Sequence, residues 1–176
     1  MKKSDALSEN LEDYLETIFD LEKANKVARA KDIAKRLGVQ RGSVTGALKS
    51  LGAKGLINYE PYSFITLTKE GTKIAEKISH HHSVLRDFFV SVLQIDSKVA
   101  DETACRMEHT ITEDSISRLV NFIDHIHRCP KTGSHWLKSF SQDCLGNEND
   151  WEKCAKCIDL CRDQHQSGEM VTRNPQ

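Results

Sequence analysis

The sequence predicts a mainly α-helical protein, and three observations lead to this expectation. Apolar residues recur at three- and four-residue spacing through most of residues 8–127, which is the period of amphipathic helices. A single short stretch, residues 56–67, favours strands instead. The 176 residues are 38% hydrophobic and 29% charged, and no apolar run approaches the ~20 residues that span a bilayer. This composition argues against both a membrane-spanning and a disordered chain.

The first helix is expected over residues 8–23. Ser8 can cap its N-terminus, and acidic side chains fill its first turns, where they favour the helix dipole. Its apolar face is formed by Leu11, Tyr14, Leu15, Ile18 and Leu21.

A helix-turn-helix should follow. A second helix covers about Ala30–Leu37, Gly38 ends it, and a third helix covers about Arg41–Lys54. Two short helices joined through a glycine by a three-residue turn have the spacing of this motif. The β-prone runs 56–59 and 64–67 then form a small hairpin. The N-terminal part is therefore predicted to be a winged helix-turn-helix.

Helices continue beyond this hairpin. A long helix is expected from Lys69 to about Leu93, and after a break further helices cover residues 98–109 and 113–127. Residues 128–176 show no strong periodicity until Trp151–Arg162, so we expect a cysteine-rich tail with one helix.

Charge is unevenly distributed, although the net charge is only −1. Residues 24–59 hold eight Lys or Arg against the single acid Asp32, whereas residues 79–176 hold 11 basic and 15 acidic residues. The basic excess coincides with the third helix, and a winged helix with such a surface is typical of DNA binding. The alternative is a winged helix that binds another protein. The candidate DNA-contacting residues are Lys31, Lys35, Arg36, Gln40, Arg41, Ser43, Thr45 and Lys49.

Candidate metal ligands lie further along the chain. Cys105, Glu108 and His109 are at positions i, i+3 and i+4 of a predicted helix, so they share one face. A thiolate, a carboxylate and an imidazole together suit a first-row transition metal, although a buried Cys beside a solvated Glu-His pair is the simpler alternative. Of the run His80–His82, at most one or two side chains can join a common site, and the others should be solvated. In the first helix, Asp13 and Glu16 offer an i, i+3 pair that helix-dipole compensation alone would also explain.

The order of these parts resembles the diphtheria toxin repressor / manganese transport regulator family of metal-dependent transcriptional regulators. The resemblance covers about residues 8–127 and is carried by Glu12-Asp13-Tyr14-Leu15-Glu16, Asp32-Ile33-Ala34, Ser43-Val44-Thr45, Leu67-Thr68-Lys69-Glu70-Gly71, His82 and Cys105-x-x-Glu108-His109. It implies a winged-helix domain (1–72), a helical metal-binding and dimerisation domain (73–127) and an added extension (128–176). It also implies a cytoplasmic homodimer that binds palindromic double-stranded operator DNA when Fe(II) or Mn(II) is present, and represses metal-homeostasis genes.

The resemblance also assigns ligands. It places the main metal site at Asp13, His82, Cys105 and Glu108, with Glu16 as a further ligand in manganese-type members and His109 serving an adjacent or second position. Cys105 falls where iron-type members have Cys, whereas Asp13 falls where manganese-type members have Asp. The chain is therefore a hybrid of the two types.

Arg86 departs from the family pattern. Members usually carry a Glu one helical turn after the histidine that matches His82, and that Glu binds a second metal. A guanidinium cannot ligate and repels a cation, and the neighbouring Asp87 points about 100° away. We therefore expect a single main metal per subunit, or a second site of altered composition.

The tail predicts a second metal centre. Its cysteines are Cys129, Cys144, Cys154, Cys157 and Cys161, of which the last three form one stripe of a helix. Four thiolates suit structural Zn(II) or an iron–sulfur cluster; the alternative is that the cysteines are small buried hydrophobes. Because the N-terminus carries no secretory signal, disulfides are not expected.

Two other functions compete with metal-dependent regulation. The first is a redox or iron–sulfur sensing regulator in which the tail cysteines are the input. The second is a thiol hydrolase that uses Cys105 and His109, which is disfavoured because no glycine-rich turn of the oxyanion type lies nearby. The sequence therefore predicts a regulator rather than an enzyme.

Overall fold

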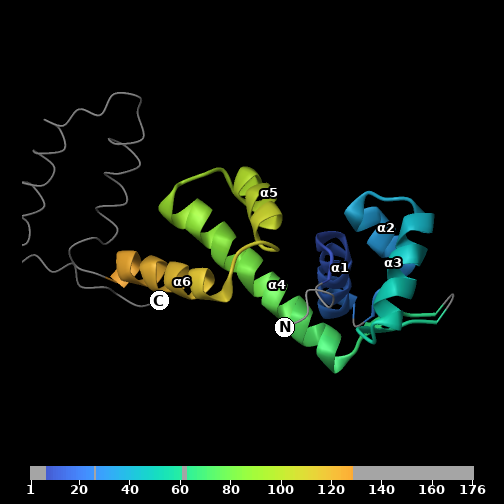
Figure 1. Cartoon of the computed structure of the whole chain (residues 1–176). Helices are drawn as coiled ribbons and strands as arrows, with labels where there is room; N and C mark the ends of the chain where they lie inside the picture. Colours follow the sequence, from blue (N-terminus) through green and yellow to red (C-terminus); the bar gives the residue numbers. More distant parts are fainter. Residues whose placement is uncertain (1–6, 26, 61–62, 129–176) are drawn as a thin grey trace, which may run out of the picture.

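The computed structural model describes residues 7–25, 27–60 and 63–128. These residues form helices and one small hairpin, as predicted (Figure 1). The predictions made for residues 129–176, including the helix at 151–162 and the five-cysteine centre, lie outside the described residues.

Three helices form the N-terminal part. They are α1 (Glu9–Asn25), α2 (Ala30–Leu37) and α3 (Arg41–Ala53), and α1 packs against both of the others. Gly38 ends α2 in the left-handed conformation (φ 66°), which glycine adopts without a Cβ clash, and its N–H donates to the carbonyl of Ala34. This turn produces the helix-turn-helix that the spacing of the two helices predicts.

The hairpin after α3 is shorter than predicted. Strand β1 (Ile57–Asn58) pairs antiparallel with β2 (Thr66–Leu67), in the register Ile57 to Leu67 and Asn58 to Thr66. Before β2, Ile65 changes partner and exchanges two backbone hydrogen bonds of 3.0 Å with Ala28, just before α2. The hairpin is therefore tied to the helix-turn-helix by its second arm.

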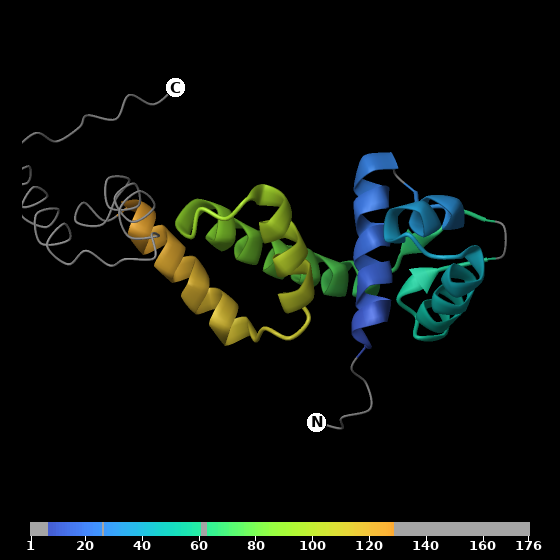
Figure 2. The same cartoon turned by 90° about the horizontal axis from the view of Figure 1, so that it is seen from above.

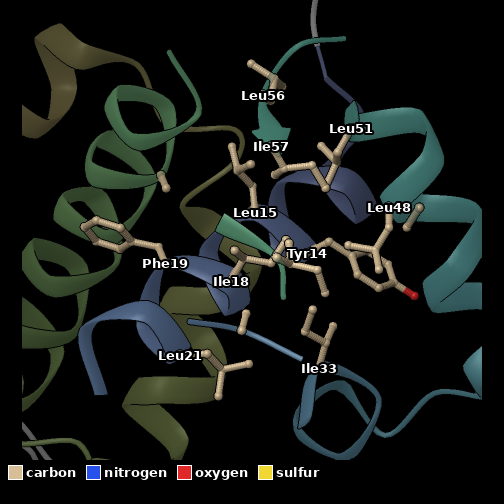
Figure 3. Close-up of a cluster of buried hydrophobic side chains, with 14 of the residues drawn as sticks. Tyr14, Leu15, Ile18, Phe19, Leu21, Ile33, Leu48, Leu51, Leu56 and Ile57 are labelled. Atoms are coloured by element: carbon tan, nitrogen blue, oxygen red, sulfur yellow. The ribbon is translucent and has the colours of Figure 1, made fainter. Parts of the chain in front are cut away.

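The first hydrophobic core lies around α1. Tyr14, Leu15 and Ile18 of α1 meet Ile33 of α2 and Leu48 of α3, and all five are at most 2% exposed (Figure 3). Figure 3 also shows Phe19 pointing from α1 toward α4 (Lys69–Asp87). The same helix that centres the winged-helix core therefore also contacts the next part of the chain.

The long helix predicted after the hairpin is present, but its last turn has a different hydrogen-bond pattern. Helix α4 passes into a π-helical turn, η1 (Phe88–Val92), in which the N–H of Leu93 donates to the carbonyl of Phe88, five residues earlier. The apolar spacing continues through this turn, so periodicity alone gave no sign of the change.

A second core is centred on α4. Helices α5 (Ser97–Met107) and α6 (Glu113–Arg128) both pack against α4. Leu85 and Ile116, each 1% exposed, lie among its largest fully buried side chains. Figure 2 shows α1 standing between α2 and α3 on one side and the α4, α5 and α6 group on the other. Among the described residues, no helix is both long and apolar enough to cross a membrane.

The junction between the hairpin and α4 is tightly closed. Thr68 caps α4 by accepting the N–H of Gly71, while its own hydroxyl donates to the carbonyl of Gly55 at 2.8 Å. The N–H of Thr68 donates to the carbonyl of Leu56 at 3.0 Å. These bonds fix the path of the chain from the hairpin into the first turn of α4.

Candidate metal centre and DNA-binding surface

Acidic and imidazole side chains from three helices meet at the contact between α1, α4 and α5. The acids Glu12, Asp13 and Glu16 come from α1, His82 comes from α4, and Glu108 and His109 follow the last turn of α5. Helix α4 packs against both α1 and α5, which brings residues about 100 positions apart in sequence within bonding distance. The cluster therefore spans the two hydrophobic cores.

One group of candidate ligands consists of Glu16, His82 and Glu108. One donor atom from each of the three lies within 4.8 Å of the others. Nδ1 of His82 is 2.6 Å from Oε2 of Glu108, and its Nε2 is 3.2 Å from Oδ1 of Asp101. The imidazole is thus placed between two carboxylates.

A second group consists of Asp13, Glu108 and His109, again within 4.8 Å of one another. Nε2 of His109 lies 2.9 Å from Oδ1 of Asp13, and Nδ1 lies 2.7 Å from Oε2 of Glu12. His109 therefore ties α5 to α1 through both of its ring nitrogens.

Glu108 belongs to both groups and is the centre of the cluster. Its side chain is fully buried (0% exposed), and its Oε1 atom has no hydrogen-bond partner, although Nε2 of His109 is 3.4 Å away. A buried carboxylate oxygen without a partner is costly unless a cation supplies the missing interaction. With carboxylates and imidazoles as the neighbouring donors, the set fits Mn(II) or Fe(II).

The surroundings shift the protonation of two candidate ligands. The hydrogen bond to Glu108, assisted by Asp101, raises the pKa of His82 to about 9 although burial opposes it. Burial, reinforced by the charge of Glu108, raises the pKa of Glu16 to about 7. Protons therefore occupy at neutral pH the positions that a cation would take.

The same crowding of acids affects His109 and Cys105. Burial lowers the pKa of His109, but the hydrogen bond to Glu12 and the nearby carboxylates outweigh it, so the net shift is upward. Partial burial of the thiol and the charge of Glu108 raise the pKa of Cys105 to about 11. Cys105 is an exposed residue on α5, and neither three-residue group includes it. The structure therefore brings Asp13, Glu16, His82, Glu108 and His109 into the two groups and leaves Cys105 beside them.

Two contact residues were missed by sequence reasoning. Glu12 reaches His109, and Asp101 reaches His82. Asp101 precedes Cys105 by four residues, one helical turn, so the face of α5 that carries the candidate ligands already included it. Glu12 is one of the acids in the first turns of its helix, but nothing in its spacing singles it out.

The expectation that the remaining histidines of the run are solvated is wrong for His81. His80 is exposed, but His81 is only 4% exposed. Nδ1 of His81 lies 3.2 Å from the carbonyl of Glu108, and its Nε2 lies 3.2 Å from Oε2 of Glu113 on α6. Because α4 is covered by both α5 and α6, one more of its faces is buried than the sequence indicated.

Arg86 lies outside both ligand groups. Its Nε is 3.3 Å from Oδ1 of Asp101, and its Nη2 donates to Oγ of Ser97 at 2.8 Å. The cation that breaks the family pattern is therefore paired with a carboxylate of the facing helix.

The candidate DNA-contacting residues form an exposed surface on α2 and α3. All eight, from Lys31 to Lys49, are exposed. Between α2, α3 and the hairpin lies a hollow of about 950 Å³, lined by basic and polar side chains such as Lys31, Arg41, Thr45 and Lys49 and by apolar and aromatic ones from the hairpin side. Basic side chains around a concave surface favour binding of a phosphate backbone.

Four of the eight candidates, Lys35, Arg36, Gln40 and Ser43, do not line this hollow, and one residue that does line it was missed. Lys35 and Arg36 line a second, smaller hollow, and Arg36 forms an ion pair with Asp20 of α1. Arg29, which precedes α2, lines the main hollow and stacks over the ring of Phe64 in the hairpin, 5.0 Å from the ring centroid. The basic segment 24–59 already contained Arg29, but only the fold shows that it lies beside the hairpin.

Two family models match the chain. Residues 6–65 match the N-terminal DNA-binding domain of iron-dependent repressors, and residues 68–137 match the metal-binding and dimerisation domain of the same proteins. The boundary between the two matches falls at the junction between the hairpin and α4.

Individual proteins show the same similarity. An uncharacterized HTH-type transcriptional regulator of Methanocaldococcus jannaschii is 37% identical over 119 residues, which cover 67% of this chain and 95% of that protein. The transcriptional regulator MntR of Escherichia coli is 36% identical over 61% of this chain and 69% of its own length. Among solved structures, IdeR of T. acidophilum superposes with a TM-score of 0.60 at 26% identity; the match covers 73% of this chain and 59% of that one.

Proposed function

Because the chain belongs to the diphtheria toxin repressor / manganese transport regulator family of metal-dependent DNA-binding transcriptional regulators, we propose that it represses metal-homeostasis genes when Fe(II) or Mn(II) is bound. The active form is a cytoplasmic homodimer on a palindromic double-stranded operator. The winged helix (1–72) contacts DNA, residues 73–127 bind metal and dimerise, and residues 128–176 form an extension.

One observation carries the proposal: the candidate ligands connect the winged helix to the helices that follow it. Glu12, Asp13 and Glu16 belong to α1, whose other side forms the core with α2 and α3. His82 and Glu108 belong to the α4 and α5 side of the contact. Any ion held by both sets restrains the angle between the DNA-binding surface and α4.

Metal, when bound, supplies a divalent positive charge that lets these buried and partly buried carboxylates approach one another without protons. Glu108 would be the shared ligand, with Glu16 and His82 on one side of it and Asp13 and His109 on the other. A single main ion per subunit is expected, because Arg86 lies one turn after His82 and a guanidinium there cannot ligate a second ion. Cys105 contributes only if its thiol loses a proton, which its raised pKa opposes.

Helix α1 connects the candidate metal ligands to the DNA-binding helices α2 and α3. Without metal, the carboxylates of α1 and α5 repel one another unless protons intervene, so the winged helix can adopt several angles. With the acids held together, the population shifts toward the angle at which the α3 helices of the two subunits match the spacing between the operator half-sites. By reciprocity, operator DNA should tighten metal binding by the same factor.

The test is an anaerobic DNA-binding titration of the full chain against its own upstream region at fixed salt, because phosphate contacts make affinity salt-dependent. Chelator, Mn(II), Fe(II) and Zn(II) are compared separately. We expect Mn(II) or Fe(II) to tighten DNA binding at least about tenfold, which corresponds to about 1.4 kcal/mol of coupling. Glu108→Gln, which keeps the shape of the shared ligand, should remove the metal effect. Equal affinity in chelator and in every metal would show that this cluster is not the switch.

A second candidate function rests on the tail. Five cysteines fall within residues 129–161, and this density favours a centre of structural Zn(II) or an iron–sulfur cluster over isolated small hydrophobic residues. If such a centre is the sensor, the protein is a redox or iron–sulfur sensing regulator. Absorbance near 400 nm in anaerobically purified protein supports a cluster, whereas colourless protein with one bound zinc supports a structural site.

Two single substitutions separate the candidate functions. Asp13→Ala removes an α1 ligand of the internal cluster, and Cys157→Ser removes one tail thiol. Loss of regulated DNA binding in Asp13→Ala alone supports metal-dependent regulation through α1. Loss in Cys157→Ser alone supports sensing by the tail.

A further inference from the structure

A chain of polar contacts runs along the outer edge of the α4–α5 interface. His82 and Arg86 lie one helical turn apart on α4, and both reach the same atom of α5, Oδ1 of Asp101. Nε2 of His82 is 3.2 Å from this oxygen and Nε of Arg86 is 3.3 Å from it. The guanidinium also donates to Oγ of Ser97 at 2.8 Å, in the first turn of α5. The contacts therefore span a full turn of both helices.

Both ring nitrogens of His82 face carboxylates, Nδ1 that of Glu108 and Nε2 that of Asp101, so the contact with Asp101 matters once a cation displaces the proton on Nδ1. An ionised carboxylate only accepts hydrogen bonds, so Nε2 must be protonated for the contact to be favourable. A neutral imidazole has one N–H, and its other nitrogen, Nδ1, then has a free lone pair. Nδ1 is the nitrogen that lies 2.6 Å from Glu108, on the side of the candidate ligands. The free lone pair therefore faces the place proposed for the ion.

Asp101 is not held by burial, so it needs another restraint. Its side chain is 59% exposed, and a short exposed carboxylate alone would exchange between rotamers. Arg86 supplies the restraint, because its Nε pairs with the carboxylate while its Nη2 is anchored on Ser97. Arg86 is 44% exposed, with its charge directed at Asp101 rather than at Glu108.

We propose that Asp101, clamped by Arg86, is a positioning residue that holds the imidazole of His82 with Nδ1 facing the metal. The proposal rests on the proposed function, since it concerns the same ion. It also explains how a guanidinium is tolerated one turn from a metal ligand: Asp101 neutralises it. Outer partners of this kind fix both the tautomer and the ring orientation of ligating histidines, and their loss typically weakens metal binding 10–100-fold.

The test compares two substitutions of Asp101 in the full chain. Asp101→Ala removes the charge and the acceptor, whereas Asp101→Asn removes the same charge but keeps an oxygen that can accept the Nε2 proton. Glu102→Ala is the matched control, because it removes a neighbouring exposed α5 carboxylate that forms no ion pair or side-chain hydrogen bond with another described residue. Mn(II) affinity is measured by calorimetry at one pH, with Mn(II) as the probe because tail thiols bind this hard cation poorly.

We expect Asp101→Ala to bind Mn(II) about tenfold more weakly than Asp101→Asn, since positioning depends on the acceptor. The Mn(II) affinity of Glu102→Ala should stay within about threefold of that of the unsubstituted chain, because loss of an exposed charge away from the site has a small effect. Equal affinities of the two Asp101 variants would overturn the proposal, because charge alone would then explain the loss. If the unsubstituted chain binds no Mn(II), it is the proposed function that fails.

A second readout follows the histidine itself. In the Zn(II)-loaded chain, nitrogen NMR of the His82 ring should show Nε2 protonated and Nδ1 bound to metal. In Asp101→Ala, the Nε2 proton should exchange faster, and Arg86→Gln should produce a smaller change in the same direction. A metal-bound Nε2 would overturn the proposal and would make Asp101 a ligand instead.

Discussion

Metal binding should depend steeply on pH, because protons occupy the candidate site of the metal-free protein. The two groups with the largest effect are His82, whose pKa is about 9, and Glu16, whose pKa is about 7. Both must give up a proton before they can ligate. Acidification is therefore the perturbation, and weaker binding is the expected direction.

The magnitude follows from these two values. At pH 7, deprotonating His82 costs about 2.7 kcal/mol, or about a hundredfold in affinity, because each pH unit below its pKa costs about 1.36 kcal/mol. Between pH 8 and pH 6.5, His82 alone weakens binding about 30-fold. Glu16 begins to protonate in the same interval and adds about fourfold. The dissociation constant for Mn(II) should therefore rise about a hundredfold from pH 8 to pH 6.5.

The assay is calorimetric titration of Mn(II) at pH 6.5, 7, 7.5 and 8, at constant ionic strength and in two buffers of different ionisation enthalpy. The difference between buffers counts the protons released by the whole cluster. We expect about one proton per ion at pH 8 and about 1.5 at pH 7, as Glu16 joins His82. An affinity that is constant across this range, or binding without proton release, would refute the reasoning.

Three further predictions concern stability and DNA binding. Folding raises the pKa values of His82 and Glu16, so their protonated forms stabilise the metal-free fold fully below pH 4.5. This stabilisation is lost as pH rises through about 7 for Glu16 and about 9 for His82. The melting temperature of the metal-free protein should therefore fall between pH 5 and pH 9.5, and a rise would contradict the assignment. Gly71→Ala should destabilise the fold by roughly 1–3 kcal/mol in denaturant titrations, because its Cβ would lie 1.9 Å from the carbonyl oxygen of Leu56, whereas Gly42→Ala, with no atom within 4 Å, should be neutral or stabilising. Lys49→Ala should weaken operator binding and lower the slope of log affinity against log salt by about one, while Lys98→Ala on α5 should leave that slope unchanged.

Much of the fold could be predicted because its signals are local. The spacing of Tyr14, Leu15 and Ile18 is enough to give α1 its buried face, and Gly38 ends α2 because the turn needs a left-handed residue. Periodicity could not distinguish the α-helical part of α4 from its π-helical end, because the apolar residues Phe88, Phe89 and Val92 suit both. The strands were overestimated because Ile65 pairs with Ala28, a partner that no local pattern indicates.

The candidate site divides in the same way. The ligand types and their positions on each helix followed from the sequence and from the family resemblance. The contacts of these residues did not follow from the sequence. His81 of α4 was expected in solvent, but it is buried against the residue that follows α5 and the start of α6. The role proposed for Asp101 depends on α5 lying along α4, because only there does its carboxylate contact His82 and Arg86.

The sequence by itself therefore determined the helices, the winged helix-turn-helix, the basic surface and the residue types available to a metal. These depend on the spacing of residues within single elements, which a chain carries in its order. Only the tertiary structure decided that Glu108 is shared by two ligand groups and that its Oε1 is buried without a hydrogen-bond partner. It also placed Cys105 outside those groups and directed the charge of Arg86 to Asp101. The physical reason is that burial and charge pairing depend on how α1, α4 and α5 pack, and this packing joins residues nearly 100 positions apart.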